Sequence, residues 1–193
     1  PITIDPVYTT ANSTVLGQNA GDGFGYAVSD AGDVDGDGYD DVIVGAVNYA
    51  SGAGRVYLYA GAATGLLTTA SVTLDGEAAG DYFGSAVAGA GDVNGDGYDD
   101  VIIGAAYHDD KGRAYLYLGS AAGLATTPDT TLDGEATGDR FGTAVAGAGD
   151  VDGDGFDEAI VGAPERDTGT GRSYVYPGSA SGLGTTASVT LDG

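Results

Sequence analysis

Three nine-residue loops carry oxygen-bearing side chains at the same four positions. Each loop has Asp, Asn or Glu at positions 1, 3, 5 and 9, and glycine at positions 4 and 6. Calcium takes about six to eight oxygen ligands, and a tight loop with alternate carboxylates can surround one ion, with the main-chain carbonyl of position 7 as a further ligand. Glycine allows the turns that a side chain would strain. The expected ligands, with position 7 included, are Asp33, Asp35, Asp37, Tyr39 and Asp41; Asp92, Asn94, Asp96, Tyr98 and Asp100; and Asp150, Asp152, Asp154, Phe156 and Glu158.

Other interpretations of these loops fit less well. An EF-hand loop needs a carboxylate at position 12, where this chain has Val44, Ile103 and Val161 inside apolar runs. Magnesium dehydrates reluctantly and seldom uses cages of protein ligands, and zinc prefers nitrogen and sulfur. Asp-Gly pairs also form plain hairpin turns, but three aligned loops favour the metal. We predict three calcium ions per chain, with a structural role, although Glu158 brings a longer side chain to position 9 of the third loop.

The charge balance excludes several classes of partner. The 193 residues include 29 Asp and Glu against 6 Lys and Arg, a net charge of -23, so the basic surface of a nucleic-acid binder or an anionic-membrane binder is missing. No apolar run approaches the roughly 18 residues that span a bilayer, so no membrane insertion is expected. Nearly half of the acids lie in the three loops, where their repulsion opposes folding unless cations bind. The absence of Cys excludes a disulfide framework and a thiolate metal site.

The chain offers little that could catalyse a reaction. The only histidine is His108, Cys is absent, and no Ser/His/Asp arrangement recurs. Adjacent acids such as Asp40 and Asp41 resemble a glycosidase pair in composition, but neighbours in an extended segment point to opposite sides. We therefore expect no enzymatic activity.

The loops belong to a repeat. Phe-Gly pairs begin at Phe24, Phe83 and Phe141, at intervals of 59 and 58 residues, and an aspartate loop follows each pair at the same distance. After each loop come an apolar run, a run with alternate tyrosines and a Thr-Leu-Asp-Gly segment, which together indicate four short strands joined by glycine-rich turns. We expect the alternate tyrosines to be packing residues, with an aromatic platform for sugar stacking as the alternative. The predicted fold class is all-β, a β-propeller with blades of four antiparallel strands and three blades per chain.

The fourth-strand pattern occurs once more before the first complete unit. We expect a linker over 1–8, the outer strand of a preceding blade over 9–17, and blades over 18–76, 77–134 and 135–193. Propellers have about four to eight blades, so three blades leave exposed edges. The preferred expectation is that two chains close into a six-bladed homodimer, and the alternative is excision from a longer array.

The Phe-Gly pairs, the aspartate loops and a third element together resemble a known family. The third element is Gly45-Ala46-Val47, Gly104-Ala105-Ala106 and Gly162-Ala163-Pro164, of which only the last reads Gly-Ala-Pro. In this combination the unit resembles the FG-GAP repeat of integrin α-subunit propellers and related bacterial surface proteins. The resemblance implies a seven-bladed propeller in full-length relatives, calcium loops on one face, and ligand contacts on the opposite face through loops that join strands 2 to 3 and 4 to 1.

Loops at the positions that the resemblance assigns to ligand contacts differ from unit to unit. The family resemblance implies an extracellular or cell-surface location, in a bacterium, and a role in protein interaction or adhesion. A glycan-binding propeller is one alternative, and an excised or engineered fragment whose activity is self-assembly is another. The candidate ligand-face residues are Asn48, Tyr49, Asp81, Tyr82, His108, Asp109, Arg140 and Arg166.

Overall fold

The computed structural model describes residues 13–193, which form three four-stranded antiparallel sheets. In each sheet the strands pair in chain order, as a meander. Among the described residues no helix is long and apolar enough to cross a membrane. The first sheet contains β1 (Phe24–Gly32), β2 (Asp41–Ala46), β3 (Arg55–Tyr59) and β4 (Val72–Asp75); the second β5 (Ala86–Gly91), β6 (Asp100–Ala105), β7 (Arg113–Tyr117) and β8 (Thr130–Asp133); the third β9 (Ala144–Gly149), β10 (Glu158–Ala163), β11 (Arg172–Tyr176) and β12 (Val189–Asp192). A short helical turn follows the second strand of each sheet: α1 (Tyr49–Gly52), η1 (His108–Asp110) and α2 (Arg166–Gly169).

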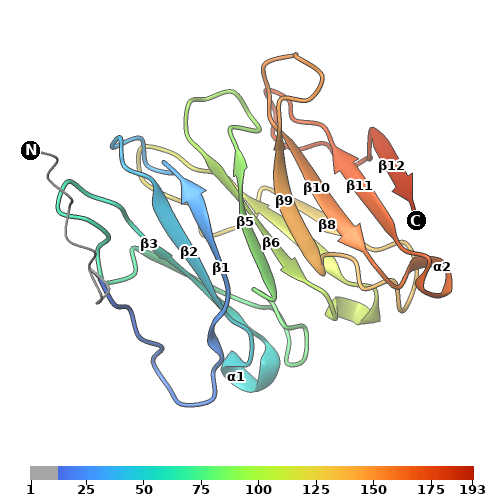
Figure 1. Cartoon of the computed structure of the whole chain (residues 1–193), viewed down its shortest axis with the longest axis horizontal. Coiled ribbons are helices and arrows are strands. Elements are labelled where there is room, and N and C mark those ends of the chain that lie inside the picture. The colour runs from blue at the N-terminus through green and yellow to red at the C-terminus, as the bar shows by residue number, and fades with distance from the viewer. Residues whose placement is uncertain (1–12) are drawn as a thin grey trace, which may run out of the picture.

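The sheets stand in a row in chain order, with the first and the third at opposite ends (Figure 1). Their first strands are neighbours, since β1 contacts β5 and β5 contacts β9. This arrangement confirms the all-β class and the three four-stranded blades predicted from the repeat. We call the three sheets with their loops blades 1, 2 and 3.

The core of the described chain lies between blades. All six residues of β6 are buried, and the apolar run that follows Asp100 is typical of a strand that is covered on both faces. Val56 and Leu58 of blade 1 pack with Val101 and Ile103 of blade 2, and a similar apolar cluster joins blades 2 and 3. Each blade therefore depends on its neighbour for burial, as in other repeat proteins.

The Phe-Gly pairs anchor an aromatic cluster at each joint between blades. Phe83 and Phe141 are each exposed to only 1%. Phe83 meets Tyr115 edge-on with 5.2 Å between ring centroids, and Phe141 meets Tyr174 in the same way at 5.4 Å. This geometry is the one that aromatic pairs prefer. The alternate tyrosines of the third strands are buried, which confirms them as packing residues: Tyr57, Tyr59, Tyr115, Tyr117, Tyr174 and Tyr176.

The segment before blade 1 takes a position that repeats later in the chain. The predicted linker over 1–8 and the first part of the predicted strand over 9–17 lie outside the described residues. Residues 13–17 form no regular strand. Gly17 nevertheless lies against Phe24, where an added Cβ would meet the Phe24 Cβ at 2.6 Å, and Gly76 lies against Phe83 in the same way at 2.7 Å. Gly17 thus has the same place beside Phe24 that Gly76 has beside Phe83.

Candidate metal centres and the opposite face

The aspartate loops are the connections between the first and second strands of each blade. In the view of Figure 1 the β5–β6 and β9–β10 connections lie along the upper edge, while α1 and α2 lie along the lower edge. Because successive strands of a meander alternate in direction, the aspartate loops share one face, and the loops that join strands 2 to 3 and 4 to 1 share the other. This arrangement agrees with the two faces that the family resemblance implies.

The carboxylate at position 1 shapes each loop. In blade 2 the Asp92 Oδ1 accepts hydrogen bonds from the N–H groups of Gly95 (2.7 Å) and Asp96 (3.0 Å), and its Oδ2 accepts one from Gly97 (2.8 Å). Gly95 and Gly97 have φ of +72° and +90°, a conformation that glycine adopts without strain. The Asp96 Oδ1 in turn accepts from the N–H of Tyr98 at position 7 (3.1 Å). The glycine spacing noted in the sequence is therefore required by the turn, and blades 1 and 3 repeat it.

The carboxylate at position 9 is the buried member of each site. Asp41, Asp100 and Glu158 are exposed to 1%, 0% and 1%. The Asp100 Oδ2 accepts a hydrogen bond from the Val93 N–H and its Oδ1 accepts one from the Gly119 N–H, both at 2.9 Å. These contacts tie the loop to the segment after β7. Glu158 makes the equivalent contacts with Val151 (2.8 Å) and Gly178 (3.3 Å), so its longer side chain preserves the arrangement.

Burial perturbs the pKa of Asp100 and of Asp41 in the direction expected for a charge without a counterion. It raises the pKa of Asp100 to about 7, because desolvation outweighs the hydrogen bonds from Gly119 and Val93, and Asp96 and Asp92 raise it further by repulsion. Burial raises the pKa of Asp41 as well. A divalent cation beside these groups would favour their charged forms.

The first and third loops each bring three carboxylate oxygen atoms close together. Asp33, Asp35 and Asp37 each place a carboxylate oxygen within 4.8 Å of the others, and Asp150, Asp152 and Glu158 do the same. In blade 2 position 3 is Asn94, whose amide nitrogen donates to Asp96 (2.9 Å) and whose amide oxygen accepts a hydrogen bond from the Asp96 N–H (2.9 Å). The expected donor atoms of the loops are all oxygens, and the position-9 carboxylate of each loop is buried. Such a donor set fits calcium rather than zinc.

Position 8 of the second and third loops has a role that the sequence did not reveal. The Asp99 Oδ2 of blade 2 accepts a hydrogen bond from the Asp33 N–H of blade 1 (2.8 Å), and the Asp157 Oδ2 of blade 3 accepts one from the Asp92 N–H of blade 2 (3.0 Å). Each blade thus caps the first residue of the preceding blade's loop. The signal for this contact is the pair of adjacent acids such as Asp99 and Asp100, whose side chains point to opposite sides, one to the neighbouring blade and one into its own.

Several candidate residues on the opposite face pair with one another. Asp81 and His108 are both buried and 2.8 Å apart, between Oδ2 and Nδ1. The equivalent pair in blade 3 is Asp139 and Arg166, at 3.4 Å. These pairs fix the loop that joins strands 4 to 1 against the loop that joins strands 2 to 3. Asp109 is exposed, with its Oδ2 3.4 Å from the His108 Nε2.

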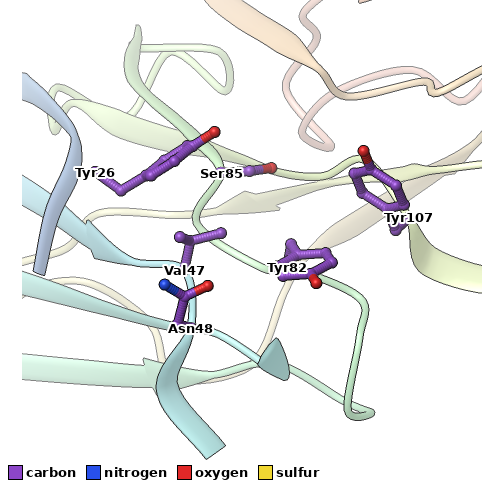
Figure 2. A pocket seen from close by; sticks show the side chains of 6 residues that line it. All are labelled: Tyr26, Val47, Asn48, Tyr82, Ser85 and Tyr107. Carbon is purple, nitrogen blue, oxygen red and sulfur yellow. The ribbon is translucent and has the colours of Figure 1, made fainter. Parts of the chain in front are cut away.

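A cavity of about 280 Å³ opens on this face between blades 1 and 2. Figure 2 shows three tyrosine rings around it. Tyr82 meets Tyr107 edge-on at 5.1 Å between centroids, and the Arg140 guanidinium lies 4.0 Å from the centroid of the Tyr107 ring. Tyr49 lies under Arg55 instead, 3.9 Å away. The lining residues are Tyr26, Val47, Asn48, Tyr82, Ser85 and Tyr107. The ligand-face residues predicted from the sequence include Asn48 and Tyr82 and omit the other four. Tyr26 and Ser85 were missed because they belong to the otherwise regular first-strand segment.

Comparisons with known proteins agree with this geometry. The FG-GAP repeat model matches residues 24–59, 83–117 and 141–176, the spans from each Phe-Gly pair to the end of the third strand. The chain is 40% identical to integrin alpha-6 of Gallus gallus over 140 residues, which are 70% of this chain and 13% of that protein. It is 35% identical to integrin alpha-6 of Homo sapiens over 139 residues (70% and 12%), and 36% identical to integrin alpha-PS2 of Drosophila melanogaster over 133 residues (63% and 10%).

The matched region is a small part of these relatives, 10% to 13% of their length. Within this chain, however, the three matches include the aspartate loops, the aromatic joints and the first three strands of every blade. The chain therefore belongs to the FG-GAP repeat family.

Proposed function

We propose that this chain is an integrin-like β-propeller module that binds an extracellular ligand through the face opposite the aspartate loops. The observation that carries this proposal is the tyrosine-lined cavity, which lies where loops of two blades meet and differ in sequence. Concave sites with aromatic walls and a few polar groups are typical ligand sites. The relatives named above are integrin α-subunits, which supports an extracellular or cell-surface location and a role in adhesion.

We further propose that calcium binds in each of the three loops as a structural component. The loops concentrate carboxylates whose repulsion opposes folding, and one carboxylate per loop is buried. An ion that binds the folded loop and not the unfolded chain stabilises the fold. The blades that these ions stabilise would span 18–76, 77–134 and 135–193, each with one complete sheet.

Calorimetric titration of metal-depleted protein with calcium chloride tests the metal proposal. We expect three ions per chain, a rise in the thermal unfolding midpoint, and much weaker binding of magnesium. Asp96→Ala should lower the count to two. The control Asp109→Ala, an exposed acid on the opposite face, should leave three. Absence of both binding heat and thermal stabilisation would overturn the proposal.

The tyrosine cavity suits either a peptide segment or a sugar, because both present apolar faces beside polar groups. A panel of immobilised extracellular-matrix glycoproteins, each tested before and after enzymatic removal of its glycans, distinguishes the two. We expect binding that Tyr107→Ala weakens at least tenfold and that Leu67→Ala leaves unchanged. Leu67 is the matched control, because its side chain is exposed to 46% against 47% for Tyr107 and it lies in the β3–β4 connection, on the face of the aspartate loops. Binding that survives deglycosylation indicates a protein ligand, and loss of binding indicates a glycan. If no glycoprotein binds, or if Tyr107→Ala has no effect, this face is not the ligand site.

A further inference from the structure

A continuous line of hydrogen bonds connects the buried position-9 carboxylates of the three aspartate loops. Between the first two loops it begins at Asp41, whose Oδ2 accepts from the Val34 N–H (3.3 Å). The Val34 carbonyl accepts from the Ser120 N–H (3.0 Å). Gly119, the residue before Ser120, donates its N–H to the Asp100 Oδ1 (2.9 Å). Two residues that follow β7 therefore bridge the second loop to the first.

The same line continues from the second loop to the third. The Asp100 Oδ2 accepts from the Val93 N–H (2.9 Å), and the Val93 carbonyl accepts from the Ser179 N–H (3.0 Å). Gly178, next to Ser179, donates its N–H to the Glu158 Oε1 (3.3 Å). Because Val93 is fully buried, its polar groups have no access to water and depend on these partners. The two joints between the described blades thus repeat one connection.

A second connection at each joint runs through position 8. The Asp99 Oδ2 accepts from the Asp33 N–H (2.8 Å), and the Asp99 N–H donates to the Asp33 carbonyl (3.2 Å). The Asp33 carboxylate in turn accepts from the N–H groups of Asp37 (3.0 Å) and Gly38 (2.8 Å). The joint between blades 2 and 3 repeats both position-8 bonds, at 3.0 and 3.1 Å. Position 8 therefore holds both main-chain groups of the residue that shapes the neighbouring loop.

Position 8 also lies between two expected ligands of its own loop. In the second loop these ligands are the Tyr98 carbonyl and the Asp100 carboxylate. Residues 98–100 would be held in place by a cation bound to both, and with them the Asp99 groups that bond to Asp33. Because ordering a segment costs conformational entropy, a loop that contacts an already ordered segment loses less entropy when it binds its own ion. Binding in one loop therefore favours binding in the loop of the adjacent blade.

Repulsion between bound ions acts in the opposite sense. At physiological ionic strength, salt screens exposed charges over a distance of about 8 Å. The hydrogen bonds of the joints act at contact distance, and those of Val34 and Val93 are buried, so salt weakens them much less. At about 0.15 M salt the connection through the joints is therefore expected to be the larger effect.

We propose that calcium binding to adjacent loops, at the sites proposed above, is positively coupled through these contacts. Asp99 and Asp157 are then positioning residues for the metal loop of the preceding blade. The first and third loops share no such contact among the described residues, so this pair is expected to bind independently. Coupling is reciprocal, so each ion of an adjacent pair raises the affinity for the other by the same factor. Typical couplings begin at about fivefold, and we expect at least that value.

Calorimetric titration of metal-depleted whole-chain variants at about 0.15 M KCl measures this coupling. Alanine at position 5 empties a loop, so double variants keep one loop and single variants keep two. The coupling factor of a pair is the overall binding constant of the two-loop variant divided by the product of the two one-loop constants. We expect at least about 5 for both adjacent pairs and about 1 for the first and third loops. The substitutions are Asp37→Ala, Asp96→Ala and Asp154→Ala.

The pair of loops without a shared joint is the control for coupled folding. If calcium acts only by folding the whole chain, every pair of loops is coupled to the same extent. Coupling that is restricted to adjacent pairs therefore distinguishes contact through the joints from folding of the chain as a whole.

Asp99→Ala tests the positioning residue itself. This substitution removes no expected ligand, and through the loss of one hydrogen bond it should lower the coupling of the first and second loops at least about threefold. The coupling of the second and third loops should not change. Asp99→Asn keeps an oxygen acceptor and should give an intermediate value. Asp40→Ala is the matched control and should leave all three factors unchanged, because Asp40 occupies position 8 of the first loop and caps no described loop.

Amide hydrogen exchange gives a second readout on the three-loop chain, in which no loop has been emptied. In calcium, Asp99→Ala should speed exchange of the Asp37 and Gly38 amides, which bond to the position-1 carboxylate of the first loop. The equivalent amides of the second loop, Asp96 and Gly97, should exchange as in the wild type. Faster exchange in both loops, or in neither, would show that Asp99 does not position the first loop.

The titrations separate a failure of the coupling from a failure of the calcium sites. Independent binding by adjacent loops would overturn the coupling and leave the calcium proposal intact, since all three loops would still be filled. Equal coupling in all three pairs would overturn it as well. If the wild-type chain takes up no calcium, both proposals fail.

Discussion

Replacing Asp100 by Asn tests how the buried carboxylate of each loop responds to calcium. Asp100 is fully buried, and without a cation its pKa is raised from 3.8 to about 7. The folded calcium-free chain therefore holds this proton more tightly than the unfolded chain. The resulting stabilisation is complete below about pH 4 and is lost as the pH rises through about 7. A shift of about three pKa units corresponds to about 4 kcal/mol of unfolding free energy.

Asparagine keeps the shape of the side chain and removes its charge. One of its two polar atoms no longer accepts a backbone N–H, which costs about 1–3 kcal/mol. Above pH 7 this cost is smaller than the charge burial that the substitution relieves, so calcium-free Asp100→Asn is expected to be more stable than the wild type by about 1–3 kcal/mol. With calcium the order reverses, because the variant has lost a ligand of the second loop.

Urea unfolding of metal-depleted protein between about pH 5 and 8 measures this difference directly. Asp109→Asn, an exposed acid on the opposite face, is the matched control. If the stability difference between Asp100→Asn and the wild type does not change with pH in the calcium-free state, the argument from charge burial is wrong. If the variant remains the more stable protein in calcium, Asp100 does not bind the ion.

Two further substitutions test the joints and the turns. Phe83→Ala should cost about 3–5 kcal/mol of unfolding free energy, as expected for a fully buried aromatic ring, whereas Leu67→Ala, at a side chain exposed to 46%, should cost less than about 1 kcal/mol in the same urea titration. Gly95→Ala should cost about 1–2 kcal/mol from its left-handed backbone, plus the displacement of the Phe156 ring that would lie 2.8 Å from the new Cβ, while Gly153→Ala should show only the backbone cost. Equal costs at the two glycines would contradict the packing of position 7 on the preceding blade.

Local patterns in the sequence were sufficient to predict the blade and the turn geometry of its aspartate loop. In blade 2 the apolar run predicted after the aspartate loop lies in β6, and the run with alternate tyrosines lies in β7. The glycines at positions 4 and 6 have positive φ in all three loops. These features follow from the periodicity of the sequence and from the conformations that glycine allows. Because the same spacing occurs three times, they could be predicted from the sequence.

Contacts between blades could not be predicted from local patterns in the sequence. The cap that Asp99 provides joins residues 66 positions apart, and neither partner differs in type from the surrounding acids. The pairing of Asp81 with His108 likewise depends on how two loops approach each other. Tyr26 belongs to an ordinary strand, and its exposure follows from the absence of a described blade on its outer side. Such properties depend on tertiary placement, which no local spacing encodes.

The direction of the loop cap also has a consequence for synthesis. The first and second aspartate loops each receive a capping carboxylate from the blade that the ribosome makes next, since Asp99 caps the loop that starts at Asp33 and Asp157 caps the loop that starts at Asp92. At about 5–20 residues per second, the first loop would wait for several seconds after its own last ligand has emerged. If cations bind during synthesis, each capped loop would bind its ion only after the next blade has been made. The loops would then be filled in order from the N-terminus, and the most recently synthesised loop would still lack its capping carboxylate.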